Sequence, residues 1–125
     1  MLERKKYLVC ITIVEARNIQ GLDAGGTSDP FVKVRCAGQE QQTQKKFEVN
    51  SCVWNQTLTF DSVIMNNYEL ETFEMVIELF DHNALLTNEL IGQYSIGLST
   101  LYRALNHEFY KNWVGLFRKD NPNKV

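Results

Sequence analysis

The feature that most constrains the fold is GLDAGGTSDPFVKV, residues 21–34, a glycine-rich turn that runs directly into a strand-like segment. Two aspartates, Asp23 and Asp29, stand at the ends of this turn. Gly25 and Gly26 let the chain reverse at low steric cost, so both carboxylates can point into one small volume. Facing carboxylates repel unless a proton or a cation lies between them. An ordinary polar loop between strands has a similar composition, so this stretch alone leaves both interpretations open.

A second stretch, FDHNALLTNELIG at residues 80–92, favours the cation. Its oxygen-bearing side chains stand at positions i, i+2 and i+8, as Asp81, Asn83 and Glu89. Calcium takes about six to eight oxygen ligands from carboxylates, amide carbonyls, the backbone and water. Two loops that each bring acidic oxygens can build such a shell. Leu85 and Leu86 lie between these positions, and adjacent leucines in a surface loop usually bury against another apolar surface.

The two stretches together resemble the C2 domain, a calcium- and phospholipid-binding β-sandwich. In that family the first loop carries an Asp and then a second Asp directly before Pro, as Asp23 and Asp29 do here. The third loop carries Asp at i, i+2 and i+8, followed by Gly at i+11. Here Asn83 and Glu89 stand in place of the second and third of these aspartates, while Gly92 matches.

The resemblance covers nearly the whole chain, from about residue 7 to about residue 117. The tail NHEFYKNWVGLF at residues 106–117, with NELIG before it, is most similar to C2 domains of ferlins, which are large multi-C2 proteins of membrane fusion and repair. We therefore expect residues 1–125 to be a single C2 domain with its core in 7–117 and a linker or tail in 118–125. The ferlin resemblance implies a tail-anchored protein on the cytoplasmic face of a membrane.

The composition agrees with one ordinary globular domain. The chain has 125 residues, of which 44% are hydrophobic and 22% are charged, which is enough for a sizeable core. A net charge of −2 gives no general attraction to nucleic acid or to anionic membranes, so any such attraction must come from a local patch. No apolar run approaches membrane-spanning length, and no signal peptide opens the chain. The three cysteines show no metal-ligand spacing and fit a reducing cytosol.

Apolar alternation predicts an all-β fold of seven strands, an antiparallel Greek-key sandwich of the C2 type II topology. The predicted strands lie at residues 7–14, 31–36, 41–47, 54–60, 73–80, 90–98 and 108–117. The C2 fold has an eighth strand, so we interpret the chain as a piece of a longer protein. Its incomplete sheet edge would then be open to pairing with another chain.

Several residues between and within these strands have a predicted place. Residues 62–71 should form the second of three loops at the binding end, and residues 99–105 a short helix with Ser99 as its N-cap. Trp54, Trp113 and Leu116 should lie in the core. In the strand at 31–36, alternation predicts inward side chains for Val32, Val34 and Cys36 and outward ones for Phe31, Lys33 and Arg35.

Basic residues can share one outer sheet face, namely Lys33, Arg35 and Lys45. In C2 domains such a face can bind phosphoinositide headgroups, each Lys near an anionic surface adding about 1 kcal/mol. The alternative is a solvated face edged with lysines that block aggregation. The alternative is favoured here, because glutamines dominate this region.

Two functions remain in competition. The first is a calcium-regulated phospholipid-binding module of a multi-C2 trafficking or fusion protein, which binds an anionic membrane through loops 21–30 and 80–90. Calcium, as one weakly held ion, would be bound by Asp23, Asp29, Asp81, Glu89 and the amide oxygen of Asn83. Leu85 and Leu86 would enter the membrane interface and contribute roughly 3–5 kcal/mol at most, so neighbouring domains in tandem would strengthen binding.

The second function is a calcium-independent protein–protein interaction domain with a degenerate metal site. An enzyme is not expected, because His82 and His107 are far apart and no nucleophile–base pattern or phosphate-cradling motif is present. Calcium titration separates the first two functions.

Overall fold

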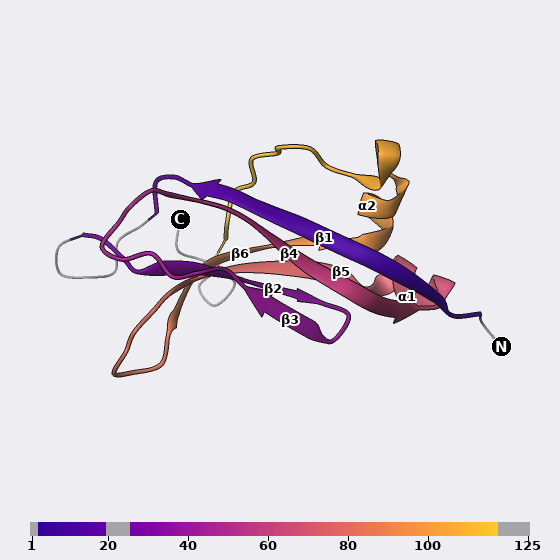
Figure 1. Cartoon of the computed structure of the whole chain (residues 1–125), viewed down its shortest axis with the longest axis horizontal. Helices are drawn as coiled ribbons and strands as arrows, with labels where there is room; N and C mark the ends of the chain where they lie inside the picture. The colour runs from indigo at the N-terminus through magenta and orange to yellow at the C-terminus, as the bar shows by residue number, and fades with distance from the viewer. Residues whose placement is uncertain (1–2, 20–25, 118–125) are drawn as a thin grey trace.

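Two antiparallel sheets face one another in this computed structural model, which describes residues 3–19 and 26–117 (Figure 1). One sheet is two-stranded and pairs β1 (Lys5–Ala16) with β4 (Cys52–Met65). The other is four-stranded with the order β3-β2-β5-β6. Its strands are β2 (Pro30–Cys36), β3 (Gln39–Gln42), β5 (Glu74–Asp81) and β6 (Glu89–Gly97). All pairings are antiparallel, so the predicted all-β antiparallel sandwich is confirmed.

The core lies between the two sheets and follows the predicted alternation. Val32, Val34 and Cys36 of β2 point inward and are buried, as predicted. They meet inward-facing residues of the other strands, because successive side chains of a strand point to opposite faces. The buried cluster also contains Leu58, Phe60, Val63 and Met65 of β4 and Met75 and Leu79 of β5. Val9, Ile11 and Ile13 of β1 pack against it from the opposite sheet.

The predicted strand at 41–47 is wrong in its bounds, because β3 covers Gln39–Gln42 instead. Ala37 and Gly38 form a two-residue turn with φ of 50° and 80°, the backbone that a tight hairpin requires. At the other end the hydroxyl of buried Thr43 accepts a hydrogen bond from the Val32 N–H at 2.9 Å. This hydroxyl takes the place of the Thr43 carbonyl in the ladder, while the Thr43 N–H still donates to Val32 O at 2.9 Å, and regular pairing of β3 ends at Gln42.

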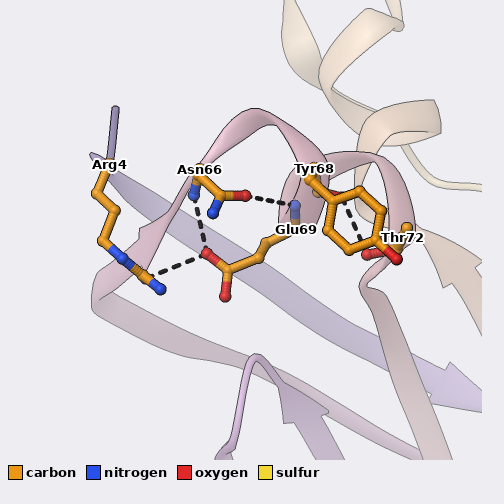
Figure 2. Close-up of polar contacts among 5 residues, drawn as sticks. All are labelled: Arg4, Asn66, Tyr68, Glu69 and Thr72. Atoms are coloured by element: carbon orange, nitrogen blue, oxygen red, sulfur yellow. Dashed lines mark hydrogen bonds and ion pairs between the residues drawn. The ribbon is translucent and has the colours of Figure 1, made fainter. Parts of the chain in front are cut away.

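The predicted loop at 62–71 is also wrong. β4 continues to Met65, and the helix α1 (Asn67–Thr72) follows it. Val63 and Met65 alternate into the core, which extends the strand. Asn66 and Glu69 then close a capping box: the Asn66 side chain accepts from Glu69 N at 2.8 Å, and the Glu69 carboxylate accepts from Asn66 N at 3.0 Å (Figure 2). The segment therefore starts a helix instead of forming a loop.

Residues 108–117 form no strand, contrary to the prediction. Only Phe117 pairs, in a single bridge to Gln93 of β6. Asn106, His107 and Lys111 have φ between 50° and 57°, which interrupts the extended backbone that a strand needs. Six strands are therefore present in residues 3–19 and 26–117, not the seven predicted.

Two of the three residues predicted to lie in the core are exposed, and the third packs against the core. Trp113 is 64% exposed and Leu116 is also exposed, so neither belongs to the core. Trp54 is half-buried against the core, and its Nε1 donates to Gln44 O at 2.8 Å. The helix α2 (Leu98–Arg103) is capped by the Gly97 backbone without a side-chain bond, so Ser99 is not its N-cap.

The strand order divides the connections between two ends of the sandwich (Figure 1). The β2–β3 turn and α1 lie at one end. At the other end, which we call the loop end, the chain passes between β1 and β2, between β3 and β4, and between β5 and β6. The middle loop of the loop end is therefore formed by residues 43–51, not by residues 62–71.

Candidate functional site

Two aspartates from distant parts of the sequence meet at the loop end. Asp29 precedes β2 and Asp81 ends β5, and Pro30 is the register partner of Asp81. The Asp29 N–H donates to Asp81 Oδ1 at 2.8 Å, and Asp29 Oδ1 accepts from Glu48 N at 2.8 Å. Each carboxylate thus uses one oxygen for a backbone N–H and leaves its second oxygen for another donor or a cation. Asp81 is only 7% exposed, which makes a lone negative charge there costly.

Glu89 and Asp23 are the other two carboxylates that the sequence predicts as calcium ligands. Glu89 is directly opposite Asp81 in the β5–β6 register and is exposed. Asp23 lies outside the described residues. The described part of the chain contains no group of three or more His, Cys, Asp or Glu side chains arranged to hold a metal ion. The site seen here is therefore the Asp29–Asp81 pair, with Glu89 on the next strand.

Asn83 has a structural partner for its amide oxygen. Asn83 Oδ1 accepts hydrogen bonds from Leu85 N at 3.0 Å and Leu86 N at 3.1 Å. Asn88 Oδ1 in turn accepts from Asn83 N at 2.8 Å and contacts His82 Nδ1 at 3.2 Å. These bonds shape the turn between β5 and β6, because a side-chain oxygen that caps its own loop fixes the backbone there.

The turn holds Leu85 and Leu86 away from the sandwich. Their side chains are 92% and 76% exposed. Two adjacent leucines at that exposure form an apolar tip, which is unfavourable in water and favourable against another apolar surface. We call this pair the leucine tip.

The outer face of β2 and β5 carries stacked aromatic rings with lysines over them. Phe31 and Phe80 stack with centroids 5.5 Å apart. Lys33 Nζ lies 5.3 Å from the Phe80 ring and Lys45 Nζ lies 5.9 Å from the Phe31 ring, distances at which a cation is attracted to a ring face. Phe31 lies on the outer face, as alternation predicts, but this stacking buries it.

Arg35 lies on the same face but faces carboxylates. Its Nε is 3.0 Å from Glu78 Oε1 and 3.7 Å from Glu40 Oε2. Glu78 is buried, so its charge depends on this partner. Three basic residues were predicted for a headgroup site. Lys33 and Lys45 lie over aromatic rings, and the charge of Arg35 is neutralised by Glu78 and Glu40.

Sequence reasoning missed the loop at residues 43–51. This loop exposes Phe47 and carries Lys46 and Glu48 beside it. The signal that could have found it is the polar run before β4 together with the short hairpin at Ala37–Gly38, which makes β3 end early.

An antiparallel sandwich whose loops gather a carboxylate pair and an apolar tip at one end is the scaffold of a binding module. Residues 7–116 match the family model of the C2 domain. The chain therefore belongs to the C2 domain family.

Curated relatives support the predicted resemblance to ferlin C2 domains, which is confirmed. The chain is 45% identical over 119 residues to Ferlin 2 of Tetrahymena thermophila, a match that covers 94% of this chain and 7% of that protein. It is 31% identical over 108 residues to Ferlin 2 of Toxoplasma gondii, covering 86% and 8%. It is 31% identical over 123 residues to Synaptotagmin 1 of Drosophila melanogaster, covering 94% and 25%. The chain thus spans a small part of these relatives.

Solved structures share the fold. A structure of two C2 domains, A and B, of Extended-Synaptotagmin 2 aligns with a TM-score of 0.67 and 27% identity, covering 82% of this chain and 34% of that one. A calcium-bound form of the same domains aligns with a TM-score of 0.67 and 26% identity, covering 82% and 38%. The A-type C2 domain of RIM from Drosophila aligns with a TM-score of 0.65 over 86% of this chain and 90% of that one, and at 20% identity it shows the fold alone.

This chain is thus a C2 domain that resembles those of ferlins and synaptotagmins, which are membrane-trafficking proteins. C2 domains of this kind are non-enzymatic binding modules. No helix in residues 3–19 and 26–117 is long and apolar enough to cross a membrane.

Proposed function

We propose that this domain is a calcium-regulated phospholipid-binding module of a longer multi-C2 protein that acts in membrane trafficking or fusion at the cytoplasmic face of a membrane. The observation that carries the proposal is the adjacent pair Asp29–Asp81 at the same end of the sandwich as the leucine tip. The carboxylate pair suits a cation, and the leucine tip suits the apolar part of a membrane interface.

With two adjacent carboxylates and no group of three or more potential ligand side chains in the described residues, we infer one weakly held calcium ion and no more. Asp29 and Asp81 would hold it with their second oxygens, and Glu89 and Asp23 would complete the carboxylate set. Because the Asn83 oxygen caps the turn in this structure, the ligand set is poorer than five aspartates, and a lower ligand charge weakens affinity. Bound calcium would offset the carboxylate charge and bridge to an anionic headgroup.

The leucine tip would contribute the apolar part of membrane binding. Burial of two leucine side chains is worth roughly 3–5 kcal/mol at most, which is a modest anchor. Several such domains in one chain would therefore bind far more tightly than one. Lys33 and Lys45 would add electrostatic attraction to anionic lipid of about 1 kcal/mol each, whereas Arg35 is offset by Glu78 and Glu40.

A second candidate is calcium-independent binding to another protein. Two observations favour it: the Asn83 oxygen is already satisfied, and within residues 3–19 and 26–117 β1 pairs only with β4. The edge of β4 that does not pair with β1 is covered by two glutamine side chains of β3. Gln39 Nε2 donates to Ser62 O at 3.0 Å, and Gln41 Nε2 donates to Thr59 O. The edge of β1 would be the place for a strand of another chain.

The test of the first function is a calorimetric calcium titration of the purified domain. We expect heat in the wild type and none in the Asp29→Asn/Asp81→Asn double variant. The matched control is Asp61→Asn, an exposed aspartate of β4, which should titrate like the wild type. No heat up to millimolar calcium would overturn calcium regulation and leave the protein-binding function.

A further inference from the structure

We propose that Phe47, in the loop at residues 43–51, is a second membrane-contacting tip of this domain and that it meets an anionic bilayer together with Lys45 and Lys46. The inference rests on the proposed phospholipid binding and adds a loop to its contact surface. The sequence predicts a strand over residues 41–47 with Lys45 as a possible headgroup-binding residue on a sheet face, and it assigns no role to Phe47.

The backbone is tethered on both sides of Phe47. Lys46 N donates to Pro30 O at 2.9 Å, and Glu48 N donates to Asp29 Oδ1 at 2.8 Å. Glu48 has a φ of 54°, a left-handed conformation that turns the chain sharply. These bonds fix the backbone on both sides of Phe47 and thereby the direction in which its side chain leaves the loop. The backbone of the loop therefore holds the Phe47 side chain at 62% exposure.

The far side of the loop is tied just as closely to the segment before β2. Ser28 and Val49 exchange two backbone hydrogen bonds of 3.1 Å and 3.0 Å. Ile19 N donates to Asn50 O at 2.8 Å. A well-supported loop that still exposes a phenyl ring to water gains nothing from that exposure in the isolated domain, which points to a surface that covers the ring.

The charges beside the ring identify the occupant. Lys45 is exposed, Lys46 is half-buried, and both directly precede Phe47. Lys45 lies over Phe31 and Lys33 over Phe80, so positive charge continues from the loop along the outer face of β2. Glu48 is the opposing charge in the loop. An aromatic side chain flanked by lysines suits the headgroup region of an anionic bilayer.

Phe47 also shares a group with the proposed calcium site. The Asp29 carboxylate that accepts from Glu48 N is one of the two that would hold the ion. The Phe47 loop and the leucine tip lie at the same end of the sandwich (Figure 1). One flat membrane can therefore touch both, and a cation at Asp29 would act directly on the backbone that carries Phe47.

The direct test places a tryptophan at the tip. Phe47→Trp should shift its emission to shorter wavelength when phosphatidylserine–phosphatidylcholine vesicles and calcium are added, as should Leu85→Trp. Tyr68→Trp is the matched control, because Tyr68 is equally exposed on α1 at the opposite end. The wild type, which contains Trp54 and Trp113, is titrated in parallel, and the shift of each variant is read as its difference from the wild type. No shift for Phe47→Trp while Leu85→Trp shifts would overturn the inference.

A vesicle-sedimentation series separates this inference from the proposed function. Phe47→Ser should lower the apparent affinity for the same vesicles by about tenfold, the effect of losing one buried apolar side chain, and Tyr68→Ser should leave it unchanged. If Leu85→Ser/Leu86→Ser weakens binding and Phe47→Ser does not, the Phe47 contact is wrong and the proposed function stands. If the wild type does not bind, both fail. Thermal unfolding of Phe47→Ser should match the wild type, because the ring is exposed.

Discussion

At the scale of single residues, the loop end shows which side-chain roles can be predicted from sequence. The proximity of Asp29 and Asp81 could be predicted, because each lies at the end of a strand with strong apolar alternation and the two strands pair. The role of Asn83 could not. Its amide oxygen has two partners within three residues, and a spacing pattern does not say whether such an oxygen faces a cation or its own backbone.

Replacement of Asn83 should loosen the turn that carries the leucine tip. Asn83→Ala removes the acceptor of the Leu85 and Leu86 N–H groups, each bond being worth about 1 kcal/mol. We expect amide hydrogen exchange at these two residues to accelerate about tenfold, measured by NMR. Asn50→Ala, at an exposed position in the neighbouring loop, is the control and should leave that exchange unchanged. Equal protection in both variants would mean that the Asn83 side chain does not hold the turn.

The cysteines should differ sharply in reactivity. Burial raises the pKa of the Cys36 thiol, and burial also raises the pKa of Cys52, partly opposed by the Lys46 charge. Cys10 is exposed. At mildly alkaline pH we expect one fast-reacting thiol with a disulfide reagent, and Cys10→Ser should abolish this fast phase. Fast reaction of two or more thiols in the native domain would contradict the described burial.

The raised pKa of Cys36 also predicts how the stability of the domain changes with pH. Because burial raises the folded-state pKa of Cys36 above its ordinary 9.0, the unfolded chain loses its proton first as pH rises. The stability linked to this thiol is intact below about pH 9 and falls as pH rises through the raised value.

At the scale of elements, long runs of apolar alternation were predicted well and their connections were not. The strands at 7–14, 31–36, 73–80 and 90–98 lie almost entirely within observed strands, because core burial enforces a period of two residues. The end of β4 was missed, since its polar outward residues resemble a loop when they are read alone. The helix α1 was missed because its signal is the Asn66–Glu69 spacing and not an apolar face.

Removal of the α1 cap should cost measurable stability. Asn66→Ala deletes the acceptor for Glu69 N, and loss of an N-cap side chain typically costs about 1 kcal/mol. The ion pair between Arg4 and the capping Glu69, at 3.1 Å, would also be weakened (Figure 2). Urea denaturation gives the free energy of unfolding, and Asn67→Ala, one residue further along, is the control that should be close to neutral. Equal unfolding free energies for the two variants would show that the capping box contributes nothing.

At the scale of the whole molecule, the two sheets differ in size, because one has two strands and the other has four. The sandwich architecture could be predicted from pattern and family resemblance, but the fate of residues 108–117 could not. Their apolar residues favour a strand, yet a strand forms only where a sheet edge accepts it. In the part of the chain that the structure describes, the segment pairs through Phe117 alone, and β1 has β4 as its one partner strand.

One edge of β1 has no partner strand among the described residues, and we expect this edge to make the domain prone to association. Leu8 is exposed on β1, and an unpaired edge with apolar side chains is a template for another strand. We expect concentration-dependent dimers in sedimentation velocity, weakened by Leu8→Lys because a charge on an edge strand opposes pairing. Tyr68→Lys, which adds the same charge on α1 and not on β1, is the control. A monomer at every concentration, with β1 amides protected from exchange, would contradict an open edge.

Co-sedimentation of the wild-type domain with phosphatidylserine vesicles tests whether the loop end binds anionic membranes under calcium control, as we propose. Matched samples contain either calcium or a calcium chelator. We expect calcium to increase the bound fraction and Leu85→Ser/Leu86→Ser to remove this increase. Equal binding with calcium and with chelator, or an increase that survives loss of both leucines, would contradict it.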